Sequence, residues 1–337
     1  EMCIRDSRYL QERRETLGGF VPERSVACDP LPAPPMTLFS EFLDGTGERP
    51  VSTTMAMVRM LGLLLKDPAI GRYVVPIVPD EARTFGLDAL FRSAGIYSPD
   101  GQRYTPVDKD SLLSYRQTTD GQILQEGICE TGAMASFMAA GSAYAVHGVP
   151  TIPFYIFYSM FGFQRVGDMV WACADMMTRG FLLGGTAGRT TLNGEGLQHE
   201  DGHSHVLAST FPNLISYDPA FAYELAIIVR DGIRRMYQDG ENVFYYITLY
   251  NENYAMPPME DSDRVTTGVV KGAYCWRQSR QQGLEVNLLA SGALMQQAIA
   301  AADTLETLGY APAIWSVTSY VELAREAEAC ERQGRLD

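Results

Sequence analysis

Residues 123–157 read ILQEGICETGAMASFMAAGSAYAVHGVPTIPFYIF, and this stretch decides the fold. Its first and last parts, residues 123–128 and 151–157, are apolar runs with the length of β-strands. Residues 131–147 between them have the length of a helix and are small and apolar all round, which is typical of a helix packed in an interior or at a subunit interface. A strand, a helix and a second strand in this order are typical of a parallel sheet.

The same alternation continues on both sides of this stretch. Further strand-like runs lie at residues 73–78, 213–216 and 243–249, and helix-length segments separate them. Before them, Ser52 is a helix-capping residue followed by apolar residues at helical spacing, and Pro68 ends that pattern. We therefore predict an α/β fold with a mainly parallel sheet flanked by helices.

A second, smaller unit follows a charged, proline-bearing linker, MPPMEDSDR, at residues 256–264. Beyond it, residues 286–290, 293–308 and 313–317 predict one strand, one helix and one further strand. One such unit provides too few strands for a whole domain, so we expect a truncated C-terminal α/β domain. The expected division of the chain has four parts: a non-native, disordered extension at residues 1–7, an interdomain connector at 8–50, a main domain at 51–263 and the partial C-terminal domain at 264–337.

Charge, cysteines and hydropathy narrow the class of protein. The 337 residues include 27 Lys and Arg against 41 Asp and Glu, a net charge of −14, and such an acidic protein cannot neutralise phosphates as nucleic-acid-binding proteins do. The six cysteines lie far apart without a C-x-x-C pair, which favours reduced thiols in the cytoplasm. No secretory leader is evident, and the longest low-charge run, residues 133–146, is too short to span a bilayer. We expect a cytoplasmic protein that binds small molecules or proteins, and neither nucleic acid nor membrane.

Residues 194–205, GEGLQHEDGHSH, contain three of the four histidines together with three carboxylates and three glycines, which is typical of an active-site loop. His199 to His203 also match H-E-x-x-H, the pattern of zinc metallopeptidases. That pattern places two ligands on one face of a helix, and here the Asp201-Gly202 turn disfavours a helix. A zinc metallopeptidase is therefore the alternative enzyme, and a polar surface loop with incidental histidines is the structural alternative.

Three long strings identify a family. They are QEGICETGA at residues 125–133, IPFYIFYSMFGFQRVGD at residues 152–168 and GGTAGRTTLNGEGLQHEDGHSH at residues 184–205. In this order they resemble the homodimeric pyruvate dehydrogenase decarboxylating component, a member of the transketolase-like thiamine diphosphate superfamily. The resemblance implies oxidative decarboxylation of pyruvate with thiamine diphosphate and Mg²⁺, followed by reductive acetylation of the lipoyl group on the lipoyl domain of dihydrolipoyl acetyltransferase. It also implies a homodimer in which residues 51–263 form the aminopyrimidine-binding domain.

The resemblance assigns the cofactor-binding residues. Glu130 is expected to hydrogen-bond the aminopyrimidine ring nitrogen and so to promote loss of the proton from the thiazolium carbon, a catalytic role. Ile128 is expected to lie beneath the cofactor, and Tyr158 and Phe161 to pack on its pyrimidine ring. Without the resemblance, these residues would have ordinary roles, either as an acidic residue that complements a helix dipole or as side chains of a core.

His199 is the expected substrate residue, because pyruvate presents a carboxylate, the reaction creates an alkoxide, and imidazole can donate a hydrogen bond to either. Glu195 aligns with a loop glutamate that orients His199 or positions the loop. Asp80 and Glu81 match a pair near the cofactor pocket, with Asp80 as a cofactor-binding residue and Glu81 as a catalytic residue. A helix N-cap is the ordinary role of such a pair.

The motif that holds the diphosphate is missing from this sequence. Transketolases hold magnesium and diphosphate through a Gly-Asp-Gly motif, which occurs nowhere in the chain. The glycines of residues 184–190 do not have the spacing of a phosphate loop, and Arg189 stands where such a loop has lysine. We therefore expect no metal ligands here and place the Mg²⁺ ligands in an N-terminal domain that the chain lacks. The chain alone is expected to be inactive, and a catalytically inert, dimerising fragment is the non-enzyme alternative.

Overall fold

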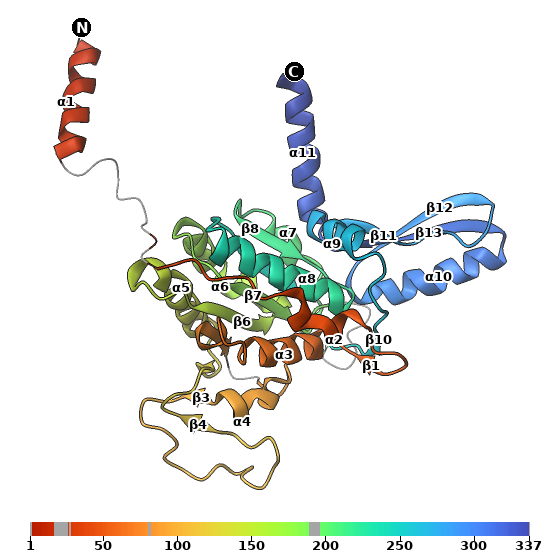
Figure 1. Cartoon of the computed structure of the whole chain (residues 1–337), viewed down its shortest axis with the longest axis horizontal. Coiled ribbons are helices and arrows are strands. Elements are labelled where there is room, and N and C mark those ends of the chain that lie inside the picture. The colour runs from red at the N-terminus through yellow and green to blue at the C-terminus, as the bar shows by residue number, and fades with distance from the viewer. Residues whose placement is uncertain (1, 17–25, 27, 80–81, 189–195, 337) are drawn as a thin grey trace.

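The computed structural model describes residues 2–16, 26, 28–79, 82–188 and 196–336 (Figure 1). A six-stranded sheet with helices packed against it forms the main part, and a three-stranded sheet lies beside it toward the C-terminus. Among the described residues, no helix is both long enough and apolar enough to cross a membrane.

The central sheet is parallel throughout, which confirms the predicted α/β class. Its strands are almost entirely buried, as expected of parallel strands that are covered on two faces. In spatial order they are β5 (Leu124–Gln125), β2 (Val74–Val78), β6 (Ile152–Tyr158), β7 (Phe181–Gly185), β9 (Phe244–Thr248) and β8 (Leu214–Tyr217). The sequence pattern predicts every one of these strands except β7.

β7 escapes prediction because its last two residues, Gly184 and Gly185, are typical of a loop. In the structure both glycines make room for an aromatic side chain. A Cβ atom at Gly184 would lie 2.3 Å from the hydroxyl oxygen of Tyr246 on β9, and one at Gly185 would lie 2.6 Å from a ring carbon of Phe85. Both distances are shorter than van der Waals contact, so only glycine lets the two aromatic side chains approach the strand this closely.

The main helices divide between the two faces of the sheet because parallel crossovers are right-handed. α5 (Glu130–Val146) and α6 (Ser159–Asp175) follow β5 and β6, step in one direction across the sheet and pack on each other. α8 (Ala222–Ile233) leads from β8 back to β9 in the opposite direction, so it covers the other face together with α3 (Thr53–Leu64). The hydroxyl of Ser52 caps α3, as predicted.

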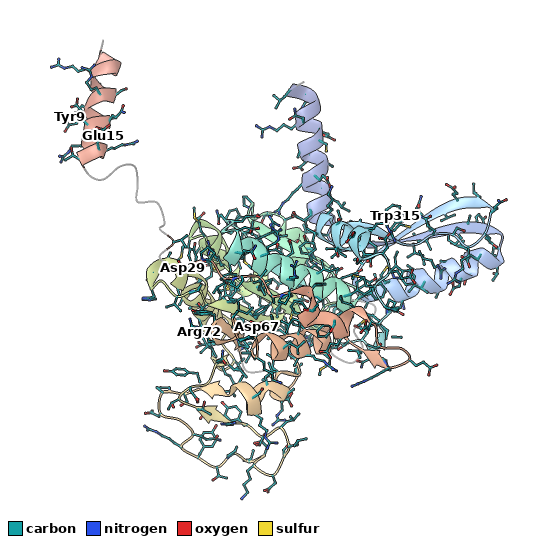
Figure 2. All side chains as sticks on the ribbon, viewed as in Figure 1. Tyr9, Glu15, Asp29, Asp67, Arg72 and Trp315 are labelled. Atoms are coloured by element: carbon teal, nitrogen blue, oxygen red, sulfur yellow. The ribbon has the colours of Figure 1, made fainter. Side chains whose placement is uncertain are left out.

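The remaining elements are mostly short. β1 pairs with β10 in antiparallel fashion, and β3 pairs with β4 in parallel. The expectation that residues 1–7 are disordered is wrong for residues 2–7, which form the start of α1, because the strong helix formers of residues 8–15 extend the helix backward. Figure 2 shows Tyr9 and Glu15 projecting from this helix. These elements are α1 (Met2–Thr16), η1 (Met36–Phe39), α2 (Ser40–Leu43), β1 (Pro50–Val51), η2 (Gly71–Tyr73), η3 (Leu87–Leu90), α4 (Phe91–Ala94), β3 (Ile96–Tyr97), β4 (Gln117–Thr118), η4 (Leu197–His199), α7 (Ser204–Ala208), the π-helix η5 (Arg234–Gln238), β10 (Tyr254–Ala255), α9 (Ser262–Lys271) and α11 (Tyr320–Leu336).

The C-terminal part contains the predicted strand, helix and strand. β12 (Leu284–Ala290) and β13 (Tyr310–Val317) are parallel, and η6 (Gly292–Leu294) and α10 (Met295–Thr307) connect them. A strand that the sequence pattern does not predict, β11 (Ala273–Arg277), pairs antiparallel with β13. The strand order is therefore β11, β13, β12.

The two sheets are joined at a fully buried carboxylate, Glu224 of α8. Its Oε1 accepts hydrogen bonds from the Tyr274 hydroxyl of β11 at 2.7 Å and from the Ser316 hydroxyl of β13 at 2.6 Å. Its Oε2 accepts the backbone N–H groups of Ala220 and Phe221. Burial raises the pKa of Glu224, although these hydrogen bonds act in the opposite direction. Glu224 therefore links a helix of the main part to two neighbouring strands of the smaller sheet.

Candidate functional site

The candidate site lies at the carboxyl ends of the parallel strands, which is where α/β proteins bind their ligands. β6 ends at Tyr158, α5 begins at Glu130 just after β5, and the segment that follows β7 carries His199. α6 begins directly after β6 and contributes Phe161 and Arg165. Residues that are far apart in the sequence thus lie at one edge of the sheet.

Glu130 lies in the first turn of α5, and its carboxylate forms an ion pair with the guanidinium of Arg165 on α6. The Glu130 side chain is 17% exposed, whereas that of Arg165 is 47% exposed. The same guanidinium lies 4.3 Å from the centre of the Phe161 ring, which is a cation–π distance. Arg165, which the sequence did not single out, therefore connects the predicted carboxylate to the predicted aromatic ring.

The imidazole of His199 lies against the two predicted aromatic residues. Its ring centre is 4.9 Å from that of Tyr158 and 5.2 Å from that of Phe161, and both contacts are edge-to-face. Tyr158 and Phe161 also contact each other edge-to-face, with 6.0 Å between ring centres. Phe85, from the segment after β2, also packs on Tyr158, with 5.1 Å between ring centres. The structure therefore brings the predicted substrate residue and the two aromatic residues predicted to bind the cofactor together in one cluster.

Ile128 is an apolar side chain that is 81% exposed. An ordinary core residue would be buried, so the structure excludes that role for Ile128. It precedes Cys129, the N-cap of α5, whose Sγ accepts the N–H of Gly132 at 3.3 Å. An exposed isoleucine two residues before Glu130 is available to contact a ligand.

Asp80, Glu81 and Glu195 lie outside the described residues. On the chain, Asp80 comes two residues after the end of β2 at Val78, and Glu195 comes directly before Gly196. The roles of these three carboxylates in cofactor binding, catalysis and loop positioning stay predictions.

The histidine segment is not a zinc-binding helix. η4 ends at His199 and α7 begins at Ser204, so His199 and His203 do not share a helix. Their surroundings also differ, because His199 lies against aromatic rings while His203 Nε2 lies 3.1 Å from the side-chain nitrogen of Gln164 on α6. The zinc metallopeptidase interpretation is therefore wrong, since a pattern that matches in sequence is split here by a turn.

Asp201 organises the histidine segment from a buried position. Its Oδ1 accepts the backbone N–H groups of His203 and Ser204, both at 3.0 Å, and its Oδ2 accepts the Ser204 hydroxyl at 2.5 Å. Burial opposes ionisation of Asp201, but the hydrogen bonds from Ser204 and His203 outweigh it and hold the pKa below its ordinary value. In the sequence, Asp201 is recognisable as a turn residue, and an aspartate just before a helix is also a capping signal.

We expect Asp201→Asn to lower the free energy of unfolding by about 1 to 2 kcal/mol at pH 7, because an amide cannot accept all of these hydrogen bonds. Because the folded pKa is depressed, the contribution of Asp201 is present above the unfolded value of about 3.9 and is lost as the pH falls through the folded value. Urea unfolding of the wild type and of Asp201→Asn at pH 7 and pH 3 measures this effect. The difference in free energy of unfolding between the two proteins should be smaller at pH 3. Asp263→Asn, at an exposed aspartate of α9, is the matched control. An equal difference at both pH values would contradict the assignment.

His205 belongs to a hydrogen-bond chain that reaches the smaller sheet. Its Nε2 lies 3.0 Å from Thr248 Oγ1, and the Thr248 hydroxyl donates to Asp218 Oδ1 at 2.6 Å. Because that hydroxyl gives its proton to Asp218, His205 donates from Nε2 in this arrangement. Asp218 Oδ2 also accepts the hydroxyl of Ser291, directly after β12, at 2.7 Å. Burial lowers the pKa of His205, while Asp218 and Asp201 act in the opposite direction.

His205 should make the protein less stable in mild acid. Because its folded pKa is lowered, its contribution is present above the unfolded value of about 6.5 and is lost as the pH falls below it. We expect His205→Asn to lose less stability than the wild type between pH 7.5 and pH 5.5, as measured by urea unfolding. His147→Asn, at an exposed histidine, is the control and should keep the wild-type profile. Identical profiles for His205→Asn and the wild type would contradict this prediction.

Two family models match the chain. Residues 34–257 match the pyruvate dehydrogenase E1 component middle domain, and residues 272–334 match the transketolase-like C-terminal domain. Among solved structures, transketolase from Campylobacter jejuni matches 85% of this chain and 38% of its own, with a TM-score of 0.63 and 16% identity. Transketolase from Leishmania mexicana matches 88% of this chain and 38% of its own, with a TM-score of 0.63 and 17% identity. At such identities the likeness shows the fold alone.

Several curated relatives are far more similar in sequence, and each is a pyruvate dehydrogenase E1 component. The protein from Pseudomonas aeruginosa is 52% identical over 333 residues, which cover 98% of this chain and 38% of the relative. The protein from Cupriavidus necator is 53% identical over 332 residues, covering 97% and 37%. The protein from Escherichia coli is 49% identical over 331 residues, covering 97% and 37%. The chain thus spans a little over a third of the length of these relatives.

Proposed function

Because the chain belongs to the family of pyruvate dehydrogenase E1 components, we propose that it is part of an enzyme that decarboxylates pyruvate oxidatively with thiamine diphosphate. In the whole protein, the acetyl group passes to the lipoyl group of dihydrolipoyl acetyltransferase. Residues 51–263 are the proposed aminopyrimidine-binding domain and residues 264–337 part of the C-terminal domain, with the Mg²⁺ ligands elsewhere in the protein. The proposed assembly is a cytoplasmic homodimer.

The residues at the sheet edge fit the aminopyrimidine ring of the cofactor. A flat heteroaromatic ring needs aromatic or apolar surfaces to pack on and a polar partner for its nitrogen. Tyr158 and Phe161 provide aromatic surfaces, and the exposed Ile128 provides an apolar one. Glu130 provides a carboxylate beside them. When bound, thiamine diphosphate supplies a nucleophilic carbon for the carbonyl group of pyruvate and takes up the negative charge that loss of CO₂ leaves behind.

Glu130 is the proposed proton-sharing group of this chain. Its carboxylate would accept a hydrogen bond from the protonated ring nitrogen, so that a proton is held at the carboxylate oxygen or at the nitrogen. The ion pair with Arg165 directs the Glu130 carboxylate to the side of α6 that carries Phe161. Arg165 must share the carboxylate with the ring nitrogen or release it, and its exposed side chain has room to do so.

His199 is the proposed substrate residue. Its ring lies against Tyr158 and Phe161, so the same aromatic pair positions it relative to the cofactor ring. From there its N–H group can donate to the carboxylate of pyruvate or to the alkoxide formed from the carbonyl group. Glu195 would orient this imidazole, Asp80 would bind the cofactor and Glu81 would act in proton transfer.

A single observation carries the proposal: Glu130, Arg165, Phe161, Tyr158 and His199 form one continuous chain of contacts at the ligand-binding edge of the sheet. A carboxylate that only caps a helix, or an aromatic side chain that only fills a core, does not require contacts of this kind. The contacts join an acid–base group, aromatic surfaces and an imidazole, which are the kinds of group that the proposed reaction requires.

Calorimetric titration of thiamine diphosphate with Mg²⁺ tests the proposal. The chain is mixed with the separately produced N-terminal diphosphate-binding part of the Escherichia coli relative, and pyruvate decarboxylation is followed with an artificial electron acceptor. We expect saturable binding and turnover in the mixture and no turnover by either part alone. A mixture that assembles but neither binds the cofactor nor reacts would contradict the proposal and support a catalytically inert, dimerising fragment.

A further inference from the structure

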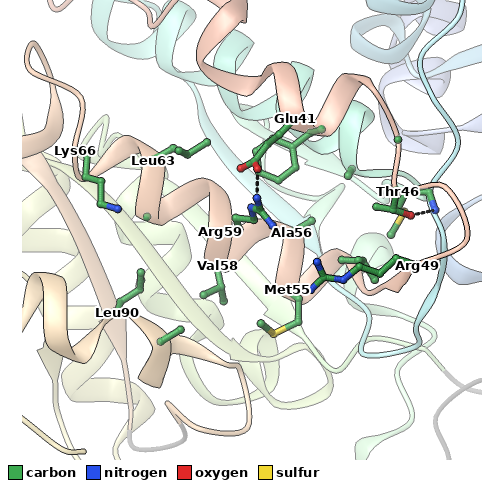
Figure 3. A pocket seen from close by; sticks show the side chains of 17 residues that line it. Glu41, Thr46, Arg49, Met55, Ala56, Val58, Arg59, Leu63, Lys66 and Leu90 are labelled. Atoms are coloured by element: carbon green, nitrogen blue, oxygen red, sulfur yellow. Dashed lines mark hydrogen bonds and ion pairs between the residues drawn. The ribbon is translucent and has the colours of Figure 1, made fainter. Parts of the chain in front are cut away.

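A hollow of about 660 Å³ opens on the main part at a place where none of the described site residues lines it (Figure 3). One wall is α3, a second is the strap of α2 and β1 before it, and a third is the η3 segment with Leu90. Ala222 of α8 and Met256 after β10 also line it. Cavities of this volume hold small organic molecules.

The walls of the hollow are fixed by contacts within the protein. Glu41 on α2 forms an ion pair with Arg59 on α3, which Figure 3 shows as a dashed line. In the strap, the N–H of Thr46 donates to the carbonyl of Met256 at 2.9 Å, and the N–H of Met256 donates to Thr46 Oγ1 at 2.9 Å. Gly45 adopts a φ of +73°, and a Cβ there would lie 2.7 Å from the Met256 carbonyl oxygen. The hollow is therefore preformed and does not depend on a ligand to open it.

The hollow is positively charged, although the chain as a whole has a net charge of −14. Arg49, Arg59 and Lys66 line it, and Glu41 is the only carboxylate among its lining residues. Glu41 is paired with Arg59, so the charges of Arg49 and Lys66 are not neutralised within the hollow. A local excess of positive charge on an acidic protein concentrates anions at that place.

The two uncompensated cations lie at opposite ends of α3 (Figure 3). Arg49 lies near the N-terminal end of the helix, where the helix dipole adds positive potential. Lys66 lies just after the C-terminal end of α3, where the backbone carbonyl groups reduce the positive potential. Arg49 also has a planar guanidinium that can bind both oxygens of a carboxylate or phosphate. An anionic head group is therefore favoured at the Arg49 end.

The surface between these ends is apolar. Met55, Val58, Leu63 and Leu90 line it, and Met55 is 44% exposed. Methionine adapts its flexible side chain to ligands of different shape. The apolar surface favours a ligand with a hydrocarbon or aromatic body over a fully hydrated anion.

We propose that this hollow binds a small amphipathic anion, with a carboxylate or phosphate head at Arg49 and an apolar body lying along α3 toward Leu90. Octanoate is the probe, and binding is followed by NMR of the chain labelled with ¹³C at the methionine methyl groups. Met55 and Met256 report from the hollow, and Met55→Leu identifies the resonance of Met55. We expect a saturable shift of both resonances with octanoate, and none with inorganic phosphate or with octyltrimethylammonium at the same concentrations.

Single variants locate the head group. Arg49→Gln should weaken octanoate binding about fivefold, as expected for the loss of one charge-assisted contact. Lys66→Gln should weaken it less than about twofold, because its charge is offset by the helix end. Lys109→Gln, at an exposed lysine outside the hollow, is the matched control for net charge and should have no effect. Ala89→Phe, at an exposed lining residue of η3, should block binding by filling the hollow.

Three outcomes would overturn the proposal. The first is the absence of a saturable shift at Met55 with octanoate. The second is equal binding of octanoate and octyltrimethylammonium, which would make the hollow an apolar groove without preference for anions. The third is displacement of octanoate by an acidic amphipathic peptide at a far lower concentration, which would make this face a docking surface for protein.

Discussion

Glu130→Gln will lower the rate of pyruvate decarboxylation at least about a hundredfold in the chain combined with the diphosphate-binding part of a relative. Glu130 is the proposed partner of the aminopyrimidine nitrogen, and a neutral amide cannot share a proton with it. The substitution keeps the size of the side chain and should spare the fold, since loss of a paired charge at a helix N-terminus costs about 1 to 2 kcal/mol. The effect should therefore lie in catalysis and not in folding.

Initial rates over a range of pyruvate concentrations measure this effect, and the loss should appear in kcat. Glu126→Gln is the matched control, because Glu126 is an exposed carboxylate four residues earlier that bonds Ser136 and takes no part in the ion pair of Glu130. It should retain wild-type activity. A kcat for Glu130→Gln within about threefold of the wild type would remove Glu130 from the proton-sharing role.

Glu224→Ala will lower the free energy of unfolding by about 3 to 5 kcal/mol. The fully buried carboxylate accepts hydrogen bonds from Tyr274, Ser316 and two backbone N–H groups. Alanine removes the acceptor of the Ser316 hydroxyl and of both N–H groups, leaves Tyr274 only its contact with the Tyr223 hydroxyl and creates a cavity. Urea unfolding of the chain at pH 7, followed by circular dichroism, measures the change. Glu285→Gln, at an exposed glutamate of β12, is the control and should be neutral. A change below about 1 kcal/mol for Glu224→Ala would show that the two sheets are held together by other contacts.

The pH dependence of a second variant, Glu224→Gln, tests the protonation state of this carboxyl group. Because burial raises the pKa of Glu224, its stabilising contribution is present below the unfolded value of about 4.3 and is lost as the pH rises through the folded value. Glutamine resembles the protonated form at every pH. The stability that Glu224→Gln loses relative to the wild type should therefore shrink between pH 4 and pH 7. A difference that grows with pH would mean that Glu224 is ionised in the folded protein.

The strands of the central sheet could be predicted because buried parallel strands are continuous apolar runs, and five of them have that form in the sequence. β7 could not, because Gly184 and Gly185 have a packing role that depends on Tyr246 and Phe85, which are distant in the sequence. β11 lies in a short segment that pairs antiparallel with β13, and an isolated strand of five residues gives little pattern to detect. α1 shows the opposite case, because this helix spans residues that the sequence pattern assigns partly to a disordered extension, 1–7, and partly to an interdomain connector, 8–50.

The candidate site depended on the family resemblance for Glu130, Ile128, Tyr158, Phe161 and His199, since each residue type alone has a commoner structural role. The structure places these residues at one edge of the sheet. Arg165 and the capping role of Asp201 were not predicted. The pairing of Arg165 with Glu130 joins residues on different helices, and no spacing along the chain reveals it. Asp201 does have a signal in the sequence, because it lies just before a helix, but the Asp201-Gly202 pair is also typical of a turn, and only the turn entered the prediction.

Gly184 of β7 also restricts the order in which substitutions can accumulate in this protein. A methyl group at position 184 would overlap the phenol oxygen of Tyr246, so Gly184→Ala is excluded while that tyrosine is present. In a lineage where Tyr246 has first become a smaller residue, the same substitution no longer meets the phenol ring and has only the close approach to the Ser159 Cβ, at 3.0 Å, to accommodate. The two positions are therefore epistatic, and among related sequences a larger residue at 184 should occur only together with a smaller one at 246.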